Sequence, residues 1–341
     1  MSQNDMTIDN STGANVRADI NSAIQALATN NSGSSAPSTT FASQFFANTT
    51  SSIMQLRNTA NNAHINLFSL AGAPAFPLDG TINSINIGKG ANSVAGNTVL
   101  GESALDASVS GGNNTAIGKD ALTALTSGSS NVAVGSFALD ANTAASNNTS
   151  LGHVSLSANT TGGENTAVGS QALKNNTTAS SNTAVGQAAL LENTTGANNV
   201  AVGALALDAN TTASNNTALG YNSLSANTTG DKNTSVGANS LDVNTTGRLN
   251  TAMGQDALGA NTTADNNTAY GQASLRANTT GTENTGVGSS ALFANTTASN
   301  NTAVGFVALL SNTTGRQNVA VGNESLELNT TGNFNTAVGR A

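Results

Sequence analysis

NTAVGSQALKNNTTASS, residues 165–181, is followed directly by NTAVGQAALLENTTGAN, residues 182–198. The same 17-residue unit can be followed through fifteen glycines, from Gly101 to Gly339, each 17 residues after the last. We number the repeat positions 0 to 16 from this glycine, so that position 3 is Ala or Ser, position 4 is Leu and position 13 is Asn. A fixed short period of this kind is the signature of a fold built by stacking identical units.

The spacing of apolar residues inside one unit favours strands over helices, because it does not recur at the intervals of a helix face. The NTAVG segment alternates: Thr or Val and then Val, Ile, Leu, Met or Tyr share one face, and a small Ala lies on the other. We expect a second short strand at the Ala/Ser-Leu pair. NTTG or NTTAS supplies the turn, since Asn and Gly tolerate a positive φ. The sequence therefore predicts an all-β protein, a parallel β-solenoid or β-roll of about fifteen 17-residue coils.

Stacked parallel coils place identical side chains about 4.8 Å apart and so build ladders along the stack. For three adjoining coils the expected ladders are Gly169, Gly186 and Gly203; Asn165, Asn182 and Asn199; Val168, Val185 and Val202; and Leu173, Leu190 and Leu207. From Glu102 onward, all 21 charged residues fall at positions 1, 2, 5, 6, 11 or 12. We expect these positions to face solvent, because burying a charge against identical neighbours costs several kcal/mol.

Each coil is expected to have a thin core of about one Val-like residue and one Leu, so self-association is a natural way to gain buried area. The unbroken stripe of small residues at the centre of NTAVG is the expected contact surface. Its members are Ala116, Ala133, Ala167, Ala184 and Ala201.

The chain before the repeats is predicted to be an α+β module with several parts. Residues 1–30 carry an apolar stripe that fits a short coiled coil or a half-buried helix equally, and residues 31–40 are a linker by composition. Residues 41–75 are predicted to form a small β-meander, 76–96 a connector with a short first coil, and 97–341 the repeat shaft. The meander's phenylalanines are candidates for attachment to another protein: Phe41, Phe45, Phe46 and Phe68.

Composition argues against several classes of function. Only 8% of the 341 residues are charged and the net charge is −8, so no basic surface for nucleic acid is expected. Cys is absent, and no run of 18 apolar residues suggests a membrane span. His64 and His153 have no partners at metal-site or triad spacing, and the carboxylates do not pair regularly across repeats. We therefore expect no enzymatic activity, no cofactor and no metal.

The segment SINIGKGANSVAGNTVLG, residues 84–101, with the following NTAIG, NVAVG and NTALG motifs, resembles the head repeat of trimeric adhesins of the YadA type. The resemblance implies a left-handed parallel β-roll with three chains around one axis for residues 81–341. The coils here are longer than those usual in that family. The sequence also shows no signal peptide, stalk or membrane barrel, which argues against a bacterial autotransporter.

Residues 12–40, TGANVRADINSAIQALATNNSGSSAPSTT, and the FASQFF segment after them resemble the N-terminal module of tail-fibre proteins from tailed bacteriophages. This resemblance implies a structural or adhesion fibre of the virion, with its N-terminal module held by tail or adaptor proteins. The shaft would then point towards a host receptor or a distal tip protein near Ala341, which is expected to be a processed end or to contact that tip. The alternatives are a bacterial surface adhesin head, a self-assembling filament and an ice-binding solenoid. The last is disfavoured because NTT places its two Thr side by side in a turn.

Overall fold

The computed structural model describes residues 32–33, 45–48, 53–57, 64–69, 80–82 and 85–340. The chain divides into two compact units, Met1–Gly80 and Thr81–Ala341, each of which is treated by itself. The helix expected within residues 1–30 lies outside the described residues, as does most of the linker expected over 31–40.

Four strands of the first unit form one sheet in the order β1-β2-β3-β4. They are β1 (Ser32–Gly33), β2 (Phe45–Asn48), β3 (Ile53–Arg57) and β4 (His64–Ser69). β2 pairs antiparallel with β3, and β3 antiparallel with β4. These three strands fall in the segments where the sequence predicts a meander. The two-residue β1 pairs parallel with β2 and lies in the predicted linker.

The repeat region is preceded by a hairpin instead of the short first coil expected around Gly88. After β5 (Gly80–Ile82) come β6 (Ile85–Gly88), the single-turn 3₁₀ helix η1 (Ala91–Ser93) and β7 (Thr98–Gly101). β6 pairs antiparallel with β7, with Gly88 opposite Val99. The short segment between the two strands explains the difference, because a parallel crossover needs about a dozen residues or more.

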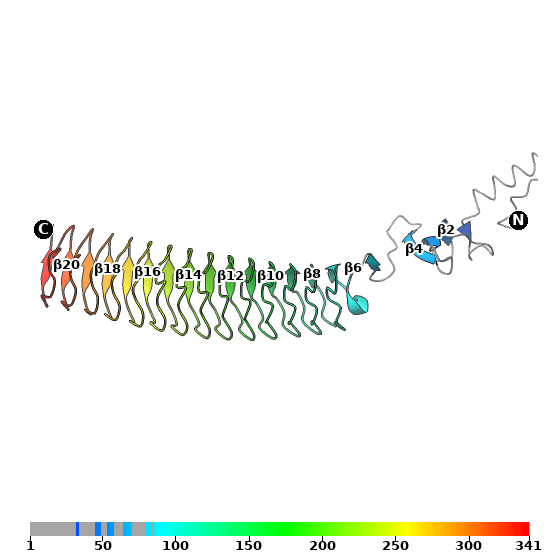
Figure 1. The fold of residues 1–341 in the computed structure, drawn as a ribbon, viewed down its shortest axis with the longest axis horizontal. Helices are drawn as coiled ribbons and strands as arrows, with labels where there is room; N and C mark the ends of the chain where they lie inside the picture. The colour runs from blue at the N-terminus through cyan, green and yellow to red at the C-terminus, as the bar shows by residue number, and fades with distance from the viewer. Residues whose placement is uncertain are drawn as a thin grey trace, which may run out of the picture. The chain divides into compact units, whose positions relative to one another are not determined.

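From β7 onward every strand pairs parallel with the next, in the register set by the 17-residue period. Thr166 lies beside Thr183, Ala167 beside Ala184 and Val168 beside Val185. Figure 1 shows the resulting stack of coils from β7 to β21. The predicted parallel β-solenoid is confirmed. The further strands are β8 (Thr115–Ile117), β9 (Val132–Val134), β10 (Thr149–Leu151), β11 (Thr166–Val168), β12 (Thr183–Val185), β13 (Val200–Val202), β14 (Thr217–Leu219), β15 (Thr234–Val236), β16 (Thr251–Met253), β17 (Thr268–Tyr270), β18 (Thr285–Val287), β19 (Thr302–Val304), β20 (Val319–Val321) and β21 (Thr336–Val338).

The wall that carries the Ala/Ser-Leu pair is a succession of turns. The prediction of a second strand on this wall is therefore wrong. The leucines at position 4 have φ between 46° and 55°, in the left-handed region. Hydrogen bonds still join the coils on this wall: the Leu173 amide donates to the Ala189 carbonyl at 3.0 Å. Leu suits this site because it is not branched at Cβ, whereas a β-branched residue is strongly disfavoured at positive φ.

The interior of the coil is half aliphatic and half amide. The aliphatic half consists of the central Ala of each strand with the Ala/Ser-Leu pair opposite it, and the leucines at position 4 from Leu105 to Leu309 are fully buried. In the other half, two columns of buried Asn meet at one carbonyl. The Gly196 oxygen accepts from Asn182 Nδ2 at 2.9 Å and from Asn193 Nδ2 at 3.0 Å. Paired in this way, buried amides avoid the cost of an unsatisfied polar group, and among the described Asn side chains the exception is Asn216, whose Nδ2 has no partner.

Candidate functional site

The predicted ladders at positions 0, 4, 13 and 16 run in register along the stack, but they do not face the same way. Asn165, Asn182 and Asn199 are fully buried, and the backbone amide of each donates to the amide oxygen of the Asn one coil before it. Leu173, Leu190 and Leu207 are also fully buried, whereas Val168 and Val185 are half-buried and Val202 is 37% exposed. The third residue of each strand therefore points outward.

The prediction that the Ala stripe is an exposed contact surface is wrong. Ala116, Ala133, Ala167, Ala184 and Ala201 are each 0% exposed within the single chain. The alternation of the strand was predicted correctly, but its inward side was not. A 17-residue coil closes so tightly that the space opposite Leu and Asn admits only a small side chain.

The outward side of the same strands forms a long surface, which we call the outer sheet face. It consists of the residues at positions 14 and 16 on β7 to β21. Position 14 is always Thr or Val, and position 16 is Ile, Leu, Val, Met or Tyr. Several of these side chains are strongly exposed, such as Leu151 at 46% and Tyr270 at 55%. No charged residue occurs in either column, so this face is uncharged along its whole length.

Charged side chains instead gather at the predicted outward positions. Between Lys89 and Arg340 no charged residue is buried as a whole, which confirms the solvent-facing positions 1, 2, 5, 6, 11 and 12, although Oδ1 of Asp140 and of Asp208 at position 5 is covered and has no hydrogen-bond partner. The ion pairs among the described residues are Lys119 with Glu102 at 3.5 Å and Arg340 with Glu324 at 3.7 Å.

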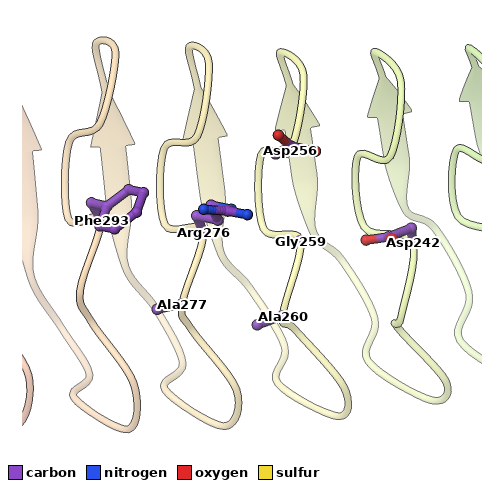
Figure 2. Close-up of a pocket in the computed structure, with 7 residues that line it drawn as sticks. All are labelled: Asp242, Asp256, Gly259, Ala260, Arg276, Ala277 and Phe293. Carbon is purple, nitrogen blue, oxygen red and sulfur yellow. The ribbon is translucent and has the colours of Figure 1, made fainter.

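Position 5 holds a hollow that the sequence prediction missed. Four successive coils place Asp242, Gly259, Arg276 and Phe293 at this position, and only Gly259 lacks a side chain. The hollow has a volume of about 410 Å³ and is also lined by Asp256, Ala260 and Ala277. In Figure 2 the side chains of Asp256, Arg276 and Phe293 lie in front of the strands, and Ala260 and Ala277 lie lower, on the segments that follow. We call it the Gly259 hollow.

Along the stack, the two carboxylates of the Gly259 hollow come first and the guanidinium follows. Burial raises the pKa of the Asp242 carboxyl, and the neighbouring Asp256 carboxylate raises it further, while a backbone hydrogen bond and Arg276 lower it. The Arg276 guanidinium lies 5.8 Å from the centre of the Phe293 ring and forms no ion pair with any described residue. The hollow thus has acceptors on one side, and a donor backed by an aromatic ring on the other.

The backbone conformation at position 259 does not require a glycine. Its φ is outside the left-handed region, and an added Cβ would lie 3.2 Å from the Asp256 carbonyl oxygen and 3.7 Å from Asp242 Oδ1. The Gly259 amide donates to Asp256 O at 3.3 Å, and the amide of Lys174, at the same position of another coil, donates to Gln171 O at the same distance. A long side chain therefore fits at position 5 of another coil. The one Gly at position 5 was the feature of the sequence that could have indicated the hollow.

The remaining predicted site residues lie in the first unit. Phe45 and Phe46 are in β2 and Phe68 is in β4, but their side chains are outside the described structure, as is the whole of Phe41. The same holds for the side chain of His64 in β4, whereas His153 is exposed on a turn.

Within the described residues, no helix is long and apolar enough to cross a membrane. Compared with models of protein families, with curated proteins and with solved structures, the chain has no match.

Proposed function

We propose that this chain is a structural and adhesion fibre of a tailed bacteriophage. Residues 1–75 attach it to the virion tail, and the solenoid projects towards the host surface. Fifteen in-register strands at about 4.8 Å spacing span roughly 67 Å, and hydrogen bonds join the coils on every wall. A rod of this construction suits a spacer that transmits load, because each coil is held by both neighbours. The resemblance of residues 12–40 to phage tail-fibre modules supplies the assignment to a virion.

The observation that carries the proposal is the outer sheet face, which we assign to contact between copies of this chain in a homotrimer. The face is about 67 Å long and roughly 10 Å wide, so it presents about 700 Å² per chain, close to the ~800 Å² per partner of a stable interface. Its uncharged columns can pack against an identical surface without burying a charge. The number three and the left-handed winding come from the resemblance to YadA-type heads.

Charge placed on the outer sheet face tests the trimer. The double variant Val185→Lys with Val202→Lys should convert the trimer to monomers in multi-angle light scattering, because each association would bury several lysines. The matched control is Gln187→Lys with Ala204→Lys, which adds the same charge at the solvent-facing position 1. A wild-type chain that is monomeric, or a control that dissociates equally, would contradict this interface.

Deletion of residues 1–75 tests attachment to the tail. The remaining chain should keep its β-rich circular dichroism and its trimeric mass, because coil stacking is local. It should no longer assemble onto fibreless tails. Decoration of tails by the truncated chain would show that the attachment site lies in the solenoid.

The regular Thr column on the outer sheet face also bears on the ice-binding alternative. Position 14 is Thr in most coils, but its outward neighbour at position 16 varies among Val, Leu, Ile, Met and Tyr. Met253 and Tyr270 in particular interrupt any flat lattice of small side chains. The face therefore fits a protein surface better than it fits ice, and no thermal hysteresis is expected.

A further inference from the structure

We propose that the Gly259 hollow binds a neutral saccharide residue. The hollow forms where the missing side chain of Gly259 opens the column between Asp242 and Arg276, and Phe293 closes its far end. Its biological use as a receptor contact rests on the proposed function. Saccharide binding itself is a property of the purified chain and can be measured without that assignment.

The arrangement of hydrogen-bonding groups favours a ligand that both donates and accepts. Asp242 and Asp256 present carboxylate oxygens on one side, while the Arg276 guanidinium presents N–H donors on the other. Asp242 and Arg276 are two coils apart, about 10 Å along the stack, which leaves room between them for one sugar ring. Sugar hydroxyls donate to carboxylates and accept from guanidinium, so the same ring can satisfy both sides.

The apolar part of the lining matches the other property of a sugar, its C–H face. Phe293 is half-buried, and Ala260 and Ala277 form the apolar floor. The Arg276 guanidinium lies 5.8 Å from the centre of the Phe293 ring, near the outer limit of a cation–π contact. An aromatic ring beside polar groups provides a large apolar contact area for few side-chain torsions.

The net charge of the lining favours neutral over anionic saccharides. Two carboxylates face one guanidinium, so the lining carries one net negative charge when both acids are ionised. An anionic sugar would meet repulsion from this side, and a neutral one would not. The hollow also lies on the wall away from the outer sheet face, so trimerisation leaves it open.

The test uses the fluorescently labelled full chain on an array of neutral hexose and N-acetylhexosamine oligosaccharides, with their sialylated counterparts beside them. The wild type should bind at least one neutral glycan and should bind its sialylated form more weakly. Gly259→Leu should reduce that binding about tenfold or more by filling the hollow, as Leu191 and Leu310 fill the same position of their own coils. Ser157→Leu puts the same residue at the same position of another coil and should leave binding unchanged.

Phe293→Ala gives a second measurement that does not depend on tolerance of a larger residue. It should also lower binding about tenfold while the circular dichroism melt and the oligomeric mass remain those of the wild type. The proposal is overturned if no neutral glycan binds, if sialylated forms bind equally well, or if Gly259→Leu binds as the wild type does. A loss of trimers with glycan binding retained would instead contradict the proposed interface and leave the saccharide site standing.

Discussion

The left-handed leucine at position 4 gives the sharpest test of how this coil closes, and Leu190→Ile is the substitution that probes it. Leu190 is fully buried with a φ of 52°, and its amide donates to Ala206 O at 3.0 Å. The exchange keeps the number of carbon atoms, so repacking alone should cost less than about 1.5 kcal/mol. The added branch at Cβ must adopt a positive φ, which costs a further ~1–3 kcal/mol.

Leu125 provides the matched control, because it is also fully buried but is not among the residues with positive φ. Leu125→Ile should therefore cost only the repacking energy of less than about 1.5 kcal/mol. Leu190→Ile should lower the local free energy of opening by ~1–3 kcal/mol more than Leu125→Ile does, which is roughly fivefold to 150-fold faster exchange than in the control.

Hydrogen exchange followed by mass spectrometry is the appropriate assay, because a stacked-repeat protein need not unfold in a single step. Peptides covering residues 186–193 should lose protection in Leu190→Ile, and peptides around Leu125 should change by about tenfold or less in Leu125→Ile. Equal losses at the two sites would refute the argument from backbone conformation and leave only packing to explain the Leu column.

Three further substitutions test other parts of the coil. Gly186→Ala places a Cβ 2.5 Å from a carbonyl oxygen of the next coil at a φ of 138°, so it should destabilise by more than about 3 kcal/mol in urea unfolding, whereas Gly163→Ala, with 3.1 Å to its nearest atom, should be close to neutral. Asn193→Ala removes three buried hydrogen bonds, two donated by its Nδ2 and one accepted by its Oδ1 from Asn210, and should cost about 2–4 kcal/mol by the same measurement; a cost below ~0.5 kcal/mol would contradict the role of the amide column. Burial raises the pKa of Asp208, so the folded chain binds this proton more tightly and stability should rise as pH falls from above the folded pKa towards the ordinary value of 3.8; burial raises the pKa of Asp140 and Asp242 in the same direction, so Asp208→Asn should reduce that slope without abolishing it, and an unchanged pH profile would contradict the argument.

The period, the register and the outward positions could be predicted from the sequence because parallel stacking ties each residue to its equivalent 17 residues later. A charge at an inward position would recur as a column of buried charges, so the placement of charges identifies the solvent-facing positions. The same logic predicts the Asn columns, since an Asn side chain carries both a donor and an acceptor and can therefore bond to the equivalent Asn of the next coil. These features follow from repetition alone and need no knowledge of how the coil closes.

Which face of the strand points into the coil could not be predicted in the same way, because neither face carries a charge. Val185 is larger and more apolar than Ala184, and hydrophobicity alone would place it inside. The small volume inside the coil has the opposite effect and places the smaller Ala184 inside. Leucine from the turn wall already occupies the centre of the coil, so Ala184 fits within and Val185 remains on the outer side, where it is half-buried.

The Gly259 hollow shows where such a fold has freedom to acquire a binding site. Positions that build the stack, such as Gly186, Leu190 and Asn193, are held by backbone conformation or by a column of hydrogen bonds, and a change in one coil disturbs its neighbours on both sides. Position 5 carries no such demand, since it accepts Asp, Thr, Ser, Lys, Leu, Arg, Phe, Glu and Gly in different coils. Omitting one side chain there opens a space about two coils long whose walls are the side chains before and after it. Sites on a solenoid of this kind therefore arise most easily by deleting or exchanging residues in its outward columns, while the coil beneath stays unchanged.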